Sequence, residues 1–125
     1  MPTQKRSLSI CFQRGASVAS ARMALGCARK LARDGNFKEA ERPLKATVEA
    51  LNWLKFYVYT YDRESLKTVR GFPAEVKKTL KILRSKDTGV VEKVKALEKL
   101  DVPLVKLTEK VKESCRGKLP GYAGR

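Results

Sequence analysis

The spacing of apolar residues constrains the fold of this chain more than any other feature, because they recur every three or four residues along most of it. Between residues 17 and 33 the recurring residues, which share one face of an α-helix, are Val18, Ala21, Leu25, Ala28 and Ala32. No segment shows the strict alternation or the Asn-Gly turn of a β-hairpin. The sequence therefore predicts an all-α fold, a single bundle-like domain of four to six helices.

The end of the first predicted helix carries a clear turn signal. In the segment RDGNF, Gly35 suits the left-handed position after a helix end, and Asn36 is a good N-cap for the next helix. Residues 28–51, ARKLARDGNFKEAERPLKATVEAL, resemble the helical hairpin of tetratricopeptide-type repeats. The same turn is similar to that of HEPN-type helical domains, whose nuclease members use an arginine and histidine pair. The resemblance implies two antiparallel helices joined at Gly35.

Prolines and glycines predict the remaining helix boundaries. Pro43 predicts either a kink or a helix that starts near Arg42, because proline costs about 3 kcal/mol inside a helix. The segment VRGFP, residues 69–73, predicts a stop, and SKDTG, residues 85–89, predicts a loop. Asp101 and Pro103 predict the start of a last helix, with a kink in one long helix as the alternative.

The residue types present argue against catalysis. The chain has no histidine, which is the commonest general base and metal ligand, and no P-loop, GxSxG or GxGxxG motif. Its three cysteines, Cys11, Cys27 and Cys115, are odd in number and far apart, so we expect small hydrophobic side chains that are at least partly buried, with one long-range disulfide as the alternative. We expect no enzyme activity, no cofactor, no metal and no small-molecule substrate.

Charge is the strongest functional signal. The chain has 28 Lys and Arg against 13 Asp and Glu, a net charge of +15, and such an excess attracts polyanions. Residues 1–33 contribute seven basic residues and no acidic one, and residues 116–125 contribute three more. We therefore predict a basic N-terminal arm at 1–16, a helical domain at 17–115 and a basic C-terminal tail at 116–125.

The composition of residues 1–33 also allows a different interpretation. An Arg-rich, Ser-rich segment without acidic residues is typical of organelle transit peptides. Against this, residues 17–33 carry the apolar face that the bundle needs. No run of residues is long and apolar enough for a membrane span, so no membrane partner is expected.

Two helical faces are candidates for phosphate contacts. In the first predicted helix, no carboxylate of the same helix neutralises the arginines. In the segment after Pro73, basic side chains lie opposite Val76 and Leu83, either as a solvated face or as a phosphate-contact stripe. Together with the two ends, the candidate nucleic-acid-binding residues are Lys5, Arg6, Arg14, Arg22, Arg29, Lys30, Arg33, Lys67, Arg70, Lys77, Lys78, Lys81, Arg84, Arg116, Lys118 and Arg125.

The segment LNWLKFYVYTY, residues 51–61, holds five of the nine aromatic residues. Leu51, Leu54 and Val58 are predicted to face the core, and a second apolar face would lie centrally in the bundle or against another subunit. The candidate residues for an oligomer contact are Trp53, Phe56, Tyr57 and Tyr59.

These observations predict a sequence-independent nucleic-acid-binding structural protein of nucleocapsid or chromatin type. We expect it to act on DNA or RNA as a homo-oligomer or beside a homologous subunit along the nucleic acid. The few Gln, Asn and Met residues are typical of thermophiles, which fits an archaeal virus or its host and a location in the virion or inside the cell. One alternative is a small helical subunit of a ribonucleoprotein, such as a ribosome or an RNA-guided effector. The other is an organelle-imported helical interaction protein.

Overall fold

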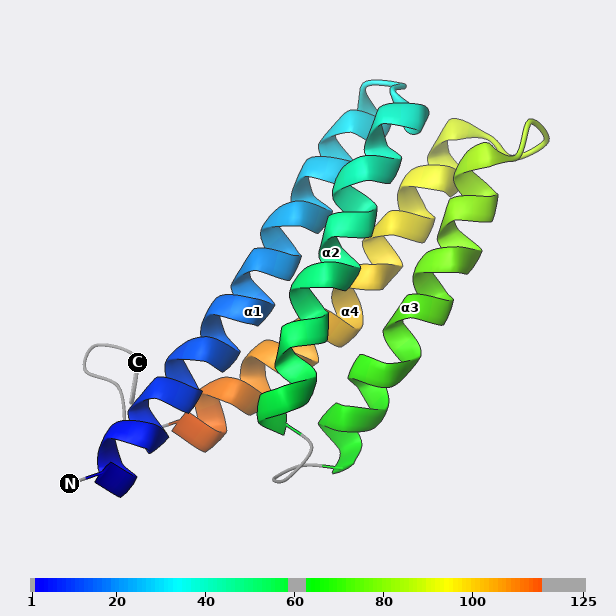
Figure 1. The fold of residues 1–125 in the computed structure, drawn as a ribbon. Coiled ribbons are helices and arrows are strands. Elements are labelled where there is room, and N and C mark those ends of the chain that lie inside the picture. Colours follow the sequence, from blue (N-terminus) through cyan, green and yellow to red (C-terminus); the bar gives the residue numbers. More distant parts are fainter. Residues whose placement is uncertain (1, 59–62, 116–125) are drawn as a thin grey trace.

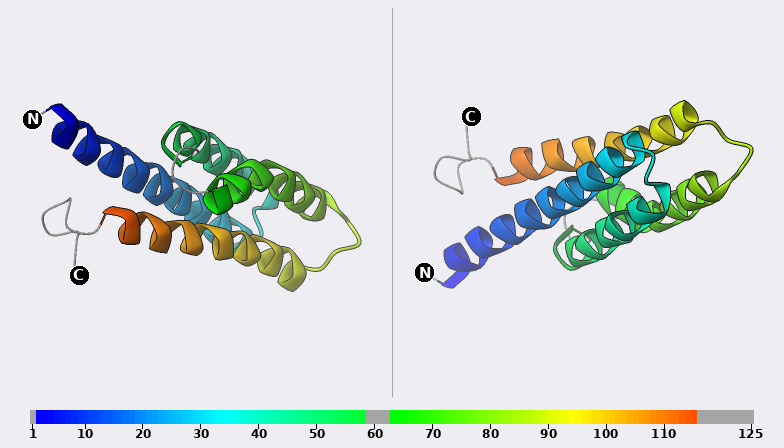
Figure 2. Two further views of the ribbon diagram at one scale, coloured as in Figure 1. Left: turned by 90° about the horizontal axis from the view of Figure 1, so that it is seen from below. Right: turned by 90° about the horizontal axis from the view of Figure 1, so that it is seen from above.

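A computed structural model describes the backbone of residues 2–58 and 63–115 and the side chains of residues 13–53 and 63–113. This part of the chain forms four helices and no strand: α1 (Pro2–Arg33), α2 (Phe37–Val58), α3 (Arg63–Arg84) and α4 (Val90–Cys115). Consecutive helices run in opposite directions (Figure 1). Helix α1 packs against α2 and α4, and α3 packs against the same two helices (Figure 2). The prediction of an all-α bundle is confirmed for these residues.

The core lies along the axis of the bundle, and each helix buries one face in it. The predicted face of α1 is confirmed, and its Ala21, Ala28 and Ala32 are fully buried. These short side chains allow α1 to lie close to its neighbours, while larger residues from the other helices fill the interior. The buried side chains of those helices include Leu44, Leu51, Val69, Phe72, Val76, Leu83, Leu97, Leu104 and Leu107.

The turn between α1 and α2 forms as the sequence predicts. Gly35 has a positive φ of 84°, a conformation that disfavours residues with a side chain. Its amide donates to the carbonyl of Ala32 at 3.0 Å, and the amide of Asn36 donates to that of Leu31 at 2.8 Å. This Schellman pair satisfies carbonyls that the end of α1 would otherwise leave free. The antiparallel hairpin implied by residues 28–51 is therefore present.

The predicted helix stop at residues 69–73 is wrong. Helix α3 runs without interruption through Gly71 and Pro73. Its buried side chains include Val69, Phe72 and Val76, at the alternating spacing of three and four that one helical face requires. Burial of a large apolar side chain contributes roughly 1.5 to 3 kcal/mol, so three of them outweigh the local cost of one proline.

The other two prolines also lie inside helices. Helix α2 starts at Phe37, so the alternative start near Arg42 is wrong. Helix α4 is continuous through Pro103, so the prediction of a separate last helix starting at Asp101 is wrong as well. The loop predicted at residues 85–89 is confirmed, since it lies between α3 and α4.

The predicted arm at residues 1–16 lies largely within a helix. Helix α1 begins at Pro2 and continues past residue 16 without a break, and the side chain of Arg14 is only 6% exposed. The bundle therefore begins before residue 17. The predicted tail at 116–125 lies outside the described residues.

Candidate nucleic-acid interface

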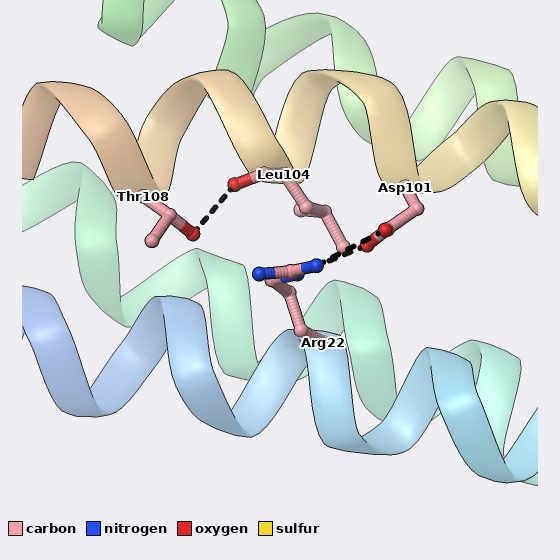
Figure 3. A network of polar contacts seen from close by, with 4 residues as sticks. All are labelled: Arg22, Asp101, Leu104 and Thr108. Carbon is pink, nitrogen blue, oxygen red and sulfur yellow. Dashed lines mark hydrogen bonds and ion pairs between the residues drawn. The ribbon is translucent and has the colours of Figure 1, made fainter.

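The arginines of α1 are neutralised by another helix. Arg22 donates from Nε and Nη2 to the two carboxylate oxygens of Asp101 in α4, at 3.1 and 3.2 Å (Figure 3). Glu98 lies about one turn before Asp101 in α4, and its Oε1 lies 3.9 Å from Nη2 of Arg29 and 3.7 Å from Nη2 of Arg33. These three arginines are therefore not unneutralised, because α4 supplies the carboxylates that α1 lacks. Their contact with nucleic acid stays a prediction.

The structure describes the side chains of some of the remaining candidates and not of others. Arg14 is buried and cannot offer its guanidinium to an external phosphate from that position, whereas Lys30 is exposed. The side chains of Lys5 and Arg6, and the whole of Arg116, Lys118 and Arg125, lie outside the part that the structure describes. The contribution of these five residues stays a prediction.

Helix α3 presents a row of exposed basic side chains to solvent. Five of them lie within about 80° of one another, on the side opposite the buried face of α3. Within the described part of the chain, none is within ion-pair distance of a carboxylate. We call these residues the outer stripe: Arg63, Lys67, Arg70, Lys77 and Lys81.

Arg63 was missed by the sequence interpretation, although the helical period contains the signal. It lies four residues before Lys67 and eighteen before Lys81, which places all three on one side of a helix. The predicted stop near Gly71 hid this relation, because it divided the stripe between two helices. The uninterrupted α3 extends the stripe over roughly 27 Å, at 1.5 Å per residue.

Two predicted members of this face are occupied within the protein. Arg84 donates from Nη2 to Oε1 of Glu41 in α2 at 2.7 Å, and its Nε lies 3.2 Å from both carboxylate oxygens. These hydrogen bonds lower the pKa of the Glu41 carboxyl, against the opposite effect of its partial burial, and raise the pKa of Arg84. Nζ of Lys78 lies 3.6 Å from Glu75 of the same helix. Arg84 therefore joins α3 to α2. Among the basic residues of α3, only those of the outer stripe lack an ion pair with a carboxylate of the described chain.

A groove of about 880 Å³ runs between α3 and α4 beside the outer stripe. Its apolar part includes Ile82, Leu100 and Pro103. Its charged lining residues carry both signs: Glu75, Lys78, Glu92, Lys95 and Lys99. Because carboxylates alternate with lysines there, the groove attracts a polyanion less than the outer stripe does.

The aromatic and cysteine predictions are corrected where the structure describes the side chain. Trp53 is 63% exposed, so it is not part of a second buried face within one chain. Phe56, Tyr57 and Tyr59 lie outside the described side chains, and the oligomer contact stays a prediction. Cys27 is exposed and free, contrary to the expected burial.

Comparisons with known protein families, with curated proteins and with solved structures give no match to this chain. Within the described residues, no three His, Cys, Asp or Glu side chains gather where a metal ion could be held. None of the helices there combines the length and apolar composition that a membrane crossing needs.

Proposed function

We propose that the protein binds nucleic acid through its phosphate backbone, with little sequence preference, as a structural protein that coats or packages it. The outer stripe of α3 is the observation that carries this proposal. Five exposed cations lie in one row, and no carboxylate of the described chain neutralises them. A row of that kind matches the continuous line of negative charge on a nucleic-acid backbone.

The composition of α3 supports recognition of phosphates over recognition of bases. Sequence-specific contacts to adenine commonly use Asn or Gln, contacts to cytosine use a free carboxylate, and contacts to guanine use Arg or Lys. Helix α3 has no Asn or Gln, and the outer stripe contains only Lys and Arg, so guanine is the one base that its side chains are suited to read. Contacts of Lys and Arg to phosphates position a protein on nucleic acid without reading its sequence.

The rest of the molecule is compatible with a packaging role. The net charge of +15 favours accumulation on a polyanion, and the basic residues predicted at both chain ends would add backbone contacts. The exposed Trp53 offers an apolar ring for contact between neighbouring copies on the same nucleic acid. A virion or a nucleoid is the setting where such loading is useful.

The proposal is tested by the salt dependence of binding, measured by fluorescence anisotropy on two duplexes of unrelated sequence. Five phosphate contacts predict a slope of log K against log salt of about −4.5 on duplex DNA, with similar affinities for both sequences. The variant Lys77→Gln/Lys81→Gln should make this slope shallower by about 1.8. A flat salt dependence or a thousandfold preference for one duplex would overturn the proposal.

A matched control uses two exposed lysines of α2, in the variant Lys38→Gln/Lys45→Gln. It removes the same charge from a helix that carries nearly balanced charge. The slope should then change by much less than in the α3 variant. Equal changes in the two variants would show that net charge alone, and not the outer stripe, determines binding.

A further inference from the structure

The outer stripe divides into two groups with an uncharged gap between them. Arg63, Lys67 and Arg70 form an N-terminal group, and Lys77 and Lys81 form a C-terminal group. Between them the stripe position is taken by Ala74, which is exposed. The centres of the two groups are roughly 18 Å apart along α3, at 1.5 Å per residue.

The stripe has a fixed shape. Helix α3 buries one face along its length, from Ser65 to Leu83. Its C-terminal end is also held to α2 by the hydrogen bonds of Arg84 to Glu41. The two basic groups are therefore held on one rigid support, and a flexible strand would have to straighten at an entropic cost to meet both.

Among the residues that the structure describes, the stripe also has no ring on which a base could stack. Phe72 is the one aromatic residue of α3, and it is 2% exposed. Trp53 of α2 lies about 120° around that helix from Glu41, one of the residues that contact α3, so it does not extend the α3 surface. Proteins that hold single strands combine a basic groove with stacking aromatic residues.

These features fit a duplex whose two strands present phosphates on either side of a groove. The major groove of B-form DNA is about 12 Å wide, and its walls carry the phosphates of opposite strands. The two basic groups of the outer stripe, centred roughly 18 Å apart, span the width of this groove. Their long side chains can reach the phosphates on either wall, while the short Ala74 lies over the groove between them. The major groove of an RNA duplex is narrow and does not offer this spacing.

We infer that the ligand of the outer stripe is B-form duplex DNA, bound across its major groove with one basic group on each strand. This inference rests on the proposed function, since it specifies the nucleic acid that the same surface binds. The two basic groups then make separate contributions to affinity on a duplex.

The test compares three probes of one sequence, each about 20 nucleotides or base pairs long, at about 50 mM and 200 mM salt: duplex DNA, single-stranded DNA and duplex RNA. Duplex DNA should bind at least about tenfold more tightly than either of the other two, with a steeper salt slope. Equal or tighter binding to the single strand or to the RNA duplex would overturn the inference and leave nucleic-acid binding intact. Absence of salt-dependent binding to all three probes would overturn the proposed function itself.

Two variants test the contribution of each group on the DNA duplex. Lys67→Gln/Arg70→Gln and Lys77→Gln/Lys81→Gln should each make the salt slope shallower by about 1.8. If one double variant keeps the full slope, only one strand is contacted, and binding across the groove is wrong. Circular dichroism of each variant at the temperature of the assay checks that the bundle is still folded.

Discussion

Two pairs of basic residues, one on α1 and one on α3, should have opposite effects when their charges are removed. The variant Arg22→Gln/Arg33→Gln should lower stability and leave most of the affinity for nucleic acid. The variant Arg70→Gln/Lys77→Gln should lower affinity and leave stability within about 0.5 kcal/mol of the original protein. Both variants remove two positive charges, so the comparison separates the role of position from that of net charge.

The magnitude for α1 follows from the geometry of its ion pairs. Asp101 is largely covered, with a side chain 21% exposed, and it accepts two hydrogen bonds from Arg22, so the loss should cost about 1 kcal/mol. The contact of Arg33 with Glu98 is longer and more exposed, and should add a few tenths of a kcal/mol. For a domain of this size the sum lowers the melting temperature by roughly 4 to 8 °C.

The magnitude for α3 follows from counterion release. Loss of two phosphate contacts makes the salt slope on duplex DNA shallower by about 1.8, while the α1 variant should change the slope by less than about 0.5. Thermal unfolding, followed by circular dichroism, measures the loss of stability. Fluorescence anisotropy at several salt concentrations measures the change in the salt slope. Equal losses of affinity in the two variants would refute the assignment of the α1 arginines to internal ion pairs and of the α3 residues to an external ligand.

Three further predictions concern the fold. Phe72→Ala should lower the free energy of unfolding by about 3 to 5 kcal/mol in urea titrations, and Phe72→Leu by clearly less, because the ring is almost fully buried between the helices. Gly35→Ala should lower the free energy of unfolding by about 1 kcal/mol in the same titrations, and Gly35→Asn by less, because the positive φ disfavours most side chains. Equal stability of Gly35→Ala and the original protein would contradict the turn geometry. The pKa of Glu41 is lowered in the folded protein by the hydrogen bonds from Arg84, so its contribution to stability is present above its ordinary pKa of 4.5 and is lost as the pH falls through the lower folded pKa. Glu41→Gln should therefore reduce the acid dependence of stability below about pH 4.5, and an unchanged pH profile would show that the pair contributes nothing.

Local and long-range information explain different parts of the fold. The buried face of α1 and the turn at Gly35 depend on residues close in sequence, and both were predicted. The helix stop predicted at Pro73 rested on a local rule about glycine and proline, which takes no account of packing. Val69, Phe72 and Val76 continue across it because α2 and α4 bury them together, and that contribution exists only once the bundle has formed.

The proposed binding surface was harder to predict for the same reason. A count along the sequence makes α1 the most attractive helix for phosphates, with seven basic residues and no carboxylate. The fold places α1 against α4, which has five carboxylates, and two of these, Glu98 and Asp101, pair with the arginines of α1.

Helix α3 looks weaker by count, because it contains two glutamates. Those glutamates flank the outer stripe, but Glu64 pairs with Lys110 of α4 and Glu75 pairs with Lys78. Neither glutamate therefore forms an ion pair with the five cations of the outer stripe. The surface available to a polyanion is thus determined by which helices become neighbours. Ala74→Glu would place a carboxylate in the middle of the outer stripe, and it should weaken nucleic-acid binding more than the same substitution at an exposed position elsewhere on the protein.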